Sequence, residues 1–198
     1  MKKEKVLSAK LKKNVKNISL LKLSAEEAAY IAGFLDGDGS IILQIIRQKS
    51  FTYGFTLRVS VCFFQKTSRN WFLSWLKEKL GNLGYLRDRT DNVSEYTITS
   101  FSEVKQVLMV LLPYLRVKKV LGNLALSIIE RKPQVKTKND FLEVCNLVDK
   151  AVFYTDSKKR KITSKIVEDS WKLPVETLEI SSAEGKKDVK TSKVTLKS

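Results

Sequence analysis

Two carboxylates, Asp36 and Asp38, stand in the segment Asp-Gly-Asp-Gly at the end of a predicted helix. The C-terminal end of a helix carries partial negative charge, so a carboxylate there is unfavourable unless a cation lies beside it. Oxygen ligands of this kind suit hard divalent cations such as Mg2+. The pattern therefore indicates a divalent-metal site, with a plain polar turn as the alternative. A calcium-binding loop is excluded, because Ile41 and Arg47 occupy the positions that require Gly and Glu.

The absence of certain residue types from the chain excludes several catalytic mechanisms and metal sites. No histidine occurs among the 198 residues, which excludes Ser-His-Asp hydrolysis, histidine-ligated zinc and a histidine general base. The two cysteines, Cys62 and Cys145, lie outside any C-x-x-C pattern, which excludes a disulfide framework and a thiolate zinc site.

The formal net charge of +16 favours nucleic acid as a partner, because Lys and Arg that bind phosphates release counterions. A merely soluble basic protein is the alternative.

The helix that positions the aspartates begins at Ser24. Ser24 and Glu27 have the spacing of a capping box, in which each side chain accepts a hydrogen bond from the other's backbone. Small residues recur every fourth position and form a smooth stripe on one helix face: Ala25, Ala29, Gly33 and Gly37, with Ala28 and Ala32 alongside. Glycine in a helix costs about 1 kcal/mol relative to alanine. Close packing of two helix backbones, as in small-xxx-small motifs, accounts for both glycines.

Hydrophobic periodicity predicts the order α-β-β-α-β-β-α, followed by three more helices. Strands are expected at 40–48, from Phe55 to about residue 64, near 85–88 and near 95–99. Helices are expected from 24 to about 37, from a cap at Thr67 to before Gly81, from Ser102 to Pro113, and at about 117–131, 139–153 and 163–172. Residues 24–174 form the predicted domain, between a flexible basic arm at 1–23 and a disordered tail at 175–198.

An antiparallel sheet built this way has one face covered by helices and one polar face. The polar face carries Ile42, Gln44, Ile46, Gln48, Thr56, Arg58, Ser60, Arg87, Arg89, Glu95, Thr97 and Thr99. Gln can bond adenine at two points, Arg can bond guanine in the same way, and Glu can accept a hydrogen bond from cytosine. The composition suits the reading of DNA bases, and an ordinary solvated sheet face fits it equally well.

The segment Ile31-Ala-Gly-Phe-Leu-Asp-Gly-Asp-Gly39 resembles the signature of the LAGLIDADG homing endonucleases. Further segments, in the same order, are similar to single-motif members encoded in group I introns of green-algal chloroplast ribosomal RNA genes: 65–71, 84–89, 113–118, 141–145 and 157–164. The similarity covers roughly residues 24–172. It implies an α+β fold, with an αββαββα core, an antiparallel DNA-binding sheet and C-terminal helices.

A single copy of the motif implies a homodimer in which the motif helices of two subunits pack together. The implied dimer interface comprises Ala25, Ala29, Ala32, Gly33, Phe34 and Gly37. The twofold symmetry of such a dimer implies a palindromic or pseudo-palindromic DNA target.

The resemblance assigns the catalytic roles. Asp38, through its carboxylate, and Gly37, through its carbonyl, are the implied Mg2+ ligands; Mn2+ is expected to substitute, and Ca2+ to bind without supporting cleavage. Three residues match the family's catalytic periphery: Gln65, which would position water, and Arg69 and Lys118, which would stabilise charge on the phosphate. Without the resemblance, these three fit a strand end, a surface arginine and a plain phosphate contact. Asp36 is interpreted as structural.

The implied DNA contacts on the sheet are the residues of the polar face except Thr99, together with Cys62. A C-terminal loop that binds the phosphate backbone provides further implied contacts. The loop residues are Ser157, Lys158, Lys159, Lys161 and Thr163. Ile46 and Cys62 depart from the polar or charged residues that the family often carries at these positions. Apolar side chains there could meet thymine methyl groups.

The function implied is that of a Mg2+-dependent endonuclease that makes a staggered double-strand break and initiates intron homing. The expected target is a long pseudo-palindromic site in an intronless ribosomal RNA gene. The alternatives are an intron RNA-binding maturase and a transcription regulator on the same fold. Retention of Asp38, Gln65, Arg69 and Lys118 disfavours a maturase without cleavage and leaves a bifunctional protein open, and the intact Asp38 disfavours the regulator. The resemblance also implies an organelle, the chloroplast before the mitochondrion.

Overall fold

The computed structural model describes residues 21–155 and 161–172. The predicted arm up to residue 20, the predicted tail, and the predicted DNA contacts Ser157, Lys158 and Lys159 lie outside the described residues. Within the described ranges, no helix is both long and apolar enough to span a membrane.

The elements follow the predicted α+β order. The core consists of α2 (Ala25–Gly37), β1 (Gly39–Arg47), β2 (Phe55–Lys66), α3 (Asn70–Lys79), β3 (Tyr85–Asp88), β4 (Val93–Ile98) and α4 (Phe101–Leu111). Three further helices follow, α5 (Lys119–Arg131), α6 (Lys138–Lys150) and α7 (Ser164–Lys172). Short 3-10 turns link them at Thr67–Arg69 (η1), Lys132–Gln134 (η2) and Ala151–Tyr154 (η3).

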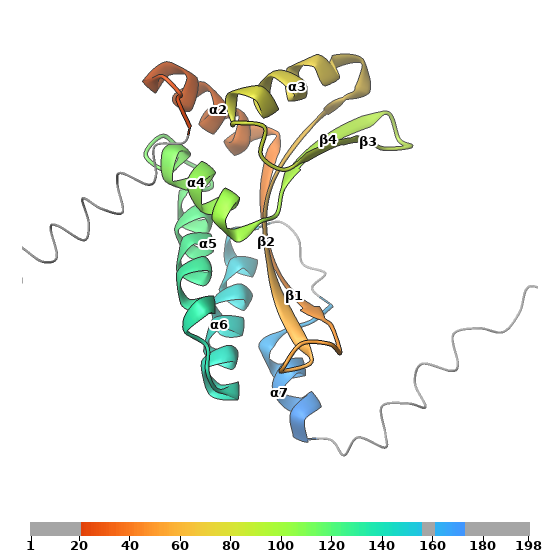
Figure 1. Cartoon of the computed structure of the whole chain (residues 1–198), viewed down its shortest axis with the longest axis vertical. Helices are drawn as coiled ribbons and strands as arrows, with labels where there is room; N and C mark the ends of the chain where they lie inside the picture. Colours follow the sequence, from red (N-terminus) through yellow and green to blue (C-terminus); the bar gives the residue numbers. More distant parts are fainter. Residues whose placement is uncertain (1–20, 156–160, 173–198) are drawn as a thin grey trace, which may run out of the picture.

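The four strands form one antiparallel sheet in the order β1-β2-β4-β3. Helices α4, α5 and α6 lie along one side of the long β1–β2 ribbon, and α2 and α3 lie toward the end where β3 and β4 join it (Figure 1). Alternate residues of the two long strands are buried in the core: Ile41, Leu43, Ile45, Phe55, Leu57, Val59, Val61 and Phe63. The period-two pattern of the sequence therefore identified the covered face correctly, and the other face is the one that can meet a ligand.

The motif helix begins as predicted, whereas the second helix does not. The Ser24 hydroxyl accepts a hydrogen bond from the Glu27 N–H at 3.2 Å, and the Glu27 carboxylate accepts one from the Ser24 N–H at 3.0 Å. The predicted cap at Thr67 is wrong, because Thr67 opens the 3-10 turn η1 and α3 starts at Asn70. The Thr67 hydroxyl instead lies 3.3 Å from the Ser94 hydroxyl, which ties this turn to β4.

Candidate active site and DNA-reading face

Asp38 is the C-cap of α2, and its side chain is exposed. Its N–H donates to the Phe34 carbonyl oxygen at 3.0 Å. Within the part of the chain that the structure describes, no group forms an ion pair or hydrogen bond with the Asp38 carboxylate. The last turn of α2 contains no basic residue. The carboxylate therefore adds to the partial negative charge of the helix end, and a cation beside it would be favourable.

Asp36, two residues earlier, has its carboxylate fully engaged. It accepts hydrogen bonds from the backbone N–H groups of Arg116 at 2.6 Å, Val117 at 3.1 Å and Lys118 at 2.8 Å. These three amides lie just before α5, which has no side-chain cap of its own. Asp36 thus fastens the end of the motif helix to the start of α5, which agrees with its interpretation as a structural residue.

Replacing Asp36 by alanine is expected to destabilise the subunit, because three N–H groups would lose a charged acceptor. A hydrogen bond to a charged group contributes about 1.5–3 kcal/mol, and partial hydration of the freed amides would reduce the total to about 3 kcal/mol. Thermal unfolding followed by circular dichroism should show a midpoint lower by about 6–12 °C. The matched control is Asp38→Ala, which should leave the midpoint unchanged or raise it. Equal losses in the two variants would contradict the assignment.

The three predicted catalytic neighbours of Asp38 come from different elements. Lys118 extends its ammonium to the Asp36 carbonyl oxygen at 2.5 Å, so it lies in the last turn of α2. Gln65 lies near the end of β2, close to Asp38 along the ladder, because Gly39 pairs with Phe63. The Gln65 Oε1 accepts a hydrogen bond from the Lys66 N–H at 3.0 Å, and the side-chain NH2 group has no hydrogen-bond partner among the described residues. Arg69 is exposed at the end of η1. The fold therefore places Lys118 beside the last turn of α2 and Gln65 near the same end of the sheet as Asp38, with Arg69 on the turn that follows β2.

The donors at this site suit a hard divalent cation such as Mg2+. Asp38 offers a carboxylate and Gly37 a carbonyl, and among the described residues no three His, Cys, Asp or Glu side chains gather as a metal cluster. Hexacoordinate Mg2+ accepts such hard oxygen donors and usually keeps several ligands from outside the protein. The same donors are poor ligands for zinc, which prefers nitrogen and sulfur. One subunit thus offers two hard oxygen donors here, fewer than a hexacoordinate cation accepts.

One face of α2 is exposed and made of small residues. Ala25, Ala29, Gly33 and Gly37 are all exposed. A Cβ atom built on Gly33 or Gly37 would meet nothing within 4 Å in the subunit. Packing inside the subunit therefore requires neither glycine, although each weakens the helix by about 1 kcal/mol relative to alanine. Within the described part of the subunit, no close contact accounts for glycine at these two positions.

Two of the predicted interface residues face inward. Ala32 is 0% exposed and belongs to the subunit's own core, so its assignment to the interface is wrong. Phe34 is half-buried, with its ring centroid 4.8 Å from that of Phe72. Tyr30 and Trp71, by contrast, are 57% and 66% exposed, and both rings contact Phe72. They extend an apolar surface from the α2 stripe onto α3.

Strand register places the predicted DNA contacts of the sheet on one face. The pairs are Ile42–Ser60, Gln44–Arg58 and Ile46–Thr56 across β1 and β2, Cys62–Thr97 across β2 and β4, and Arg87–Glu95 across β3 and β4. Gln48 and Arg89 continue the same alternation just beyond β1 and β3. All of these side chains lie opposite the covered face, because successive residues of a strand point to opposite sides.

We call this face of the sheet, which carries the residue pairs named above, the reading face. Its centre is buried, which the alternation of the sequence did not predict. Ser60, Cys62 and Thr97 are only 3%, 2% and 3% exposed. The prediction that they contact DNA directly is therefore corrected: they lie beneath the surface and support it. The Thr97 hydroxyl donates to Glu95 Oε1 at 2.7 Å and lies 3.5 Å from the Cys62 sulfur. Burial raises the pKa of the Cys62 thiol, so Cys62 acts here as a small neutral side chain.

Glu95 is the charged residue among these buried side chains of the reading face and is 8% exposed. Arg87 donates to Glu95 Oε2 from Nε at 3.3 Å and from Nη2 at 2.8 Å. Burial alone would raise the pKa of Glu95, but the hydrogen bonds from Thr97 and Arg87 and the positive charge of Arg87 outweigh it and lower the pKa. Glu95 therefore supports the reading face and orients the Arg87 guanidinium, and it is less available for direct contact than predicted.

The lowered pKa of Glu95 predicts a pH-dependent contribution to stability. The contribution is present at neutral pH and is lost as the pH falls through the folded-state pKa, because protonation removes the charge that the fold stabilises. Glu95→Gln should lower the unfolding midpoint at pH 7 by about 2–4 °C, equivalent to about 1 kcal/mol. The difference from the wild type should shrink and then vanish as the pH falls through the lowered pKa of Glu95. Asp91→Asn, which removes an exposed pair with Arg89, should change the midpoint little. A pH-independent difference would refute the argument.

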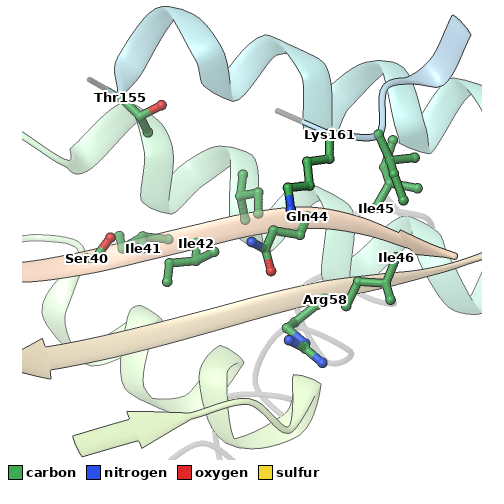
Figure 2. A pocket seen from close by; sticks show the side chains of 11 residues that line it. Ser40, Ile41, Ile42, Gln44, Ile45, Ile46, Arg58, Thr155 and Lys161 are labelled. Carbon is green, nitrogen blue, oxygen red and sulfur yellow. The ribbon is translucent and has the colours of Figure 1, made fainter. Parts of the chain in front are cut away.

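A hollow of about 620 Å³ follows β1 on the side of the C-terminal segment (Figure 2). Its lining includes Ser40 and Gln44 from β1, Arg58 from β2, and Thr155 and Lys161 from the C-terminal segment. In Figure 2 the Lys161 ammonium points toward Gln44. Lys161 thus lies beside Gln44 at the edge of the sheet, and its contact with the DNA backbone stays a prediction. The Thr163 hydroxyl accepts a hydrogen bond from the Ile166 N–H at 3.4 Å, so it also caps α7.

The structure adds two reading-face residues to the predicted set. Tyr85 pairs with Thr97 and is 46% exposed, and Phe64 pairs with Glu95 and is half-buried. Both continue the period-two alternation, Tyr85 two residues before Arg87 and Phe64 two residues after Cys62. The signal was therefore present in the sequence, but the predicted set left out these two aromatic residues.

Residues 31–130 match the LAGLIDADG endonuclease family. The DNA endonuclease I-CreI of Chlamydomonas reinhardtii is 43% identical over 147 residues, which cover 74% of this chain and 89% of that protein. The DNA endonuclease I-CvuI of Chlorella vulgaris is 35% identical over 144 residues, which cover 73% of this chain and 89% of that protein.

Solved structures agree with these sequence matches. I-CvuI, crystallised with the I-CreI target in the presence of Mg and with the DNA not cleaved, has a TM-score of 0.70 and 34% identity, covering 73% of this chain and 92% of that one. I-CvuI was also crystallised with its own target in the presence of Ca. The archaeal intron-encoded homing endonuclease I-Vdi141I, complexed with DNA, has a TM-score of 0.65 at 22% sequence identity. The match covers 74% of this chain and 97% of that one, and it supports the fold alone.

Proposed function

The chain belongs to the LAGLIDADG endonuclease family, and on that premise we propose that it is a site-specific DNA endonuclease that initiates intron homing. The observation that carries the proposal is the position of Asp38. Its carboxylate is exposed and has no partner among residues 21–155 and 161–172, and it stands at the end of the motif helix, where β1 begins. The comparisons give no support to the maturase alternative.

Mg2+ is the proposed cofactor, held by the Asp38 carboxylate and the Gly37 carbonyl. When bound, it would stabilise negative charge on the scissile phosphate and activate water for attack. Mn2+ is proposed to substitute, and Ca2+ to bind without supporting cleavage. The I-CvuI structures obtained with Mg and with Ca support the use of a divalent cation by this fold.

The remaining site residues act on the phosphate and on water. Gln65 has its amide oxygen fixed by the Lys66 N–H, so its NH2 group is free to donate and orient a water molecule. Lys118 keeps a positive charge within the last turn of α2. Arg69 is exposed on the turn that follows Gln65 and can donate to phosphate oxygens. Together they would stabilise charge that develops during hydrolysis.

Double-strand cleavage needs two such sites, so we propose a homodimer joined through the exposed α2 stripe. Each subunit contributes one reading face, and twofold symmetry makes a pseudo-palindromic target the natural substrate. On each face, the exposed side chains of Gln44, Arg58 and Arg87 are the proposed base contacts, and Lys161 holds the backbone. An organellar location, in the chloroplast, is proposed from the similarity to green-algal relatives.

The test uses purified protein and a plasmid that carries an intronless large-subunit ribosomal RNA gene. With Mg2+ we expect one double-strand cut, and with Ca2+ binding without a cut. The intron RNA serves as a competing ligand. Absence of cutting with either cation, combined with tight binding to the intron RNA, would reject the nuclease and favour the maturase.

A further inference from the structure

The far half of the β1–β2 ribbon lacks a third strand. β4 pairs with β2 only along Val61–Lys66, so Phe55–Ser60 pairs with β1 alone. A two-stranded ribbon is marginally stable by itself. In this protein it nevertheless carries predicted base contacts, including Gln44, Gln48 and Arg58. The helices α4, α5 and α6 cover one face of the ribbon (Figure 1), and the turn at its far end needs a contact of its own to be fixed.

An aromatic cluster, which we name the hairpin clamp, consists of Tyr53, Phe141 and Trp171. Tyr53 lies in the turn between β1 and β2, Phe141 on α6 and Trp171 on α7. The Tyr53 ring centroid is 5.2 Å from that of Phe141 and 6.3 Å from that of Trp171. The Trp171 indole N–H also donates to the Tyr53 carbonyl oxygen at 3.0 Å. The clamp thus fixes both the side chain and the backbone of the turn.

Helix α7 is held firmly enough to act as a support. At its start, the Ser164 N–H donates to Asp149 Oδ2 on α6 at 2.8 Å. In its middle, Val167 is 0% exposed. Near its end, the Lys138 ammonium lies 5.3 Å from the centre of the Trp171 ring, a cation–π contact from α6. Figure 1 shows α7 beside the turn end of the β1–β2 ribbon.

The clamped turn is the part of the reading face that lies farthest from Asp38. β1 starts beside Asp38 and runs for nine residues, which at about 3.3 Å per residue is roughly 30 Å. DNA rises about 3.4 Å per base pair, so the turn lies roughly nine base pairs from the cut. At that distance a small tilt of an unsupported ribbon moves its end by ångströms, whereas a specific contact tolerates about 0.5 Å.

We propose that Trp171 and Tyr53 are positioning residues that determine how strictly the outermost base pairs of each half-site are read. The proposal rests on the proposed function, since it concerns the same DNA target. The clamp holds the turn in register, so that Gln48 and the Ile46–Thr56 pair meet the bases at fixed positions. Inner base pairs, read from the three- and four-stranded part of the sheet, do not depend on it.

The test compares wild type with Trp171→Ala on the duplex that the wild type cleaves and on its single-base-pair variants. A mismatch ordinarily weakens specific binding by about 5- to 150-fold. In Trp171→Ala, the penalty at the outer three or so base pairs should fall below about threefold, while inner penalties stay unchanged. Ser170→Ala is the matched control, because the Ser170 hydroxyl donates within α7 to the Val167 carbonyl oxygen. Unchanged outer penalties, or an equal loss at every position, would overturn the proposal.

Two further measurements keep the proposal testable if Trp171→Ala folds poorly. Trp171→Phe keeps a ring and loses the N–H donor, and it should relax the outer positions partly; a folded variant with the wild-type profile would overturn the proposal. Without DNA, amide hydrogen exchange at residues 48–55 should be about tenfold faster in the variants, with α2 unaffected. A wild type that cuts no duplex would reject the proposed function, whereas a wild type that cuts and variants that keep full outer discrimination would reject only the clamp.

Discussion

Asp38→Asn is expected to abolish cleavage while DNA binding persists. Asparagine keeps the size of the side chain and loses the negative charge that would hold a divalent cation at the end of α2. A loss of at least about 10³-fold in rate, equivalent to about 4 kcal/mol of transition-state stabilisation, is expected. Binding relies on the reading face and on phosphate contacts, so the dissociation constant measured in Ca2+-free buffer should change less than about threefold.

The measurement is single-turnover cleavage of a labelled duplex, with binding followed by fluorescence anisotropy. Asp169→Asn is the matched control, since Asp169 is exposed on α7 and forms a loose pair with Lys172 at 3.8 Å. The control should cleave at the wild-type rate. If Asp38→Asn retained more than a tenth of the wild-type rate, the assignment of the metal to this carboxylate would be wrong. If it lost binding in parallel, Asp38 would be a structural or DNA-contacting residue instead.

The fold was predictable because its signals are local. The capping box at Ser24 and Glu27, the alternation along β2, and the helical spacing of apolar residues each concern a window of a dozen residues. The position of Asp38 at the end of α2 was also predictable, since a carboxylate at a helix end, two residues beyond another, is visible in the sequence. The similarity to a known family then supplied the roles of Gln65, Arg69 and Lys118, which the spacing alone left open.

The remaining features depend on tertiary contacts that no local pattern records. The acceptor role of Asp36 involves amides 80 to 82 residues away, and the bond from Trp171 to Tyr53 joins residues 118 apart. Alternation along a strand gives the face of a side chain but not its depth, which is why Cys62 and Thr97 were expected to touch DNA. Likewise, the stripe on α2 gave the spacing of the small residues but not the inward direction of Ala32.

Gly33→Leu is expected to separate the proposed dimer without unfolding the subunit. The site faces open space in the subunit, so a longer side chain meets no obstacle there, and the helix gains from losing a glycine. In the dimer, however, the same side chain would push two closely packed backbones apart. Overpacking costs about 1–3 kcal/mol per site, and twofold symmetry doubles it, so the dimer dissociation constant should rise by about 30- to 10⁴-fold.

Sedimentation over a range of protein concentrations measures the dissociation constant, and thermal unfolding measures the subunit. The instructive control is Gly39→Ala, a smaller change at a glycine six residues along. A Cβ at Gly39 would lie 2.6 Å from Leu35 Cδ1 and 2.8 Å from Leu35 Cα, so this variant should lower the unfolding midpoint. Gly33→Leu should instead yield folded monomers that no longer make double-strand cuts, because each monomer carries a single reading face and a partial metal site. Unaltered dimerisation in Gly33→Leu would mean that the α2 stripe packs against something other than a second subunit.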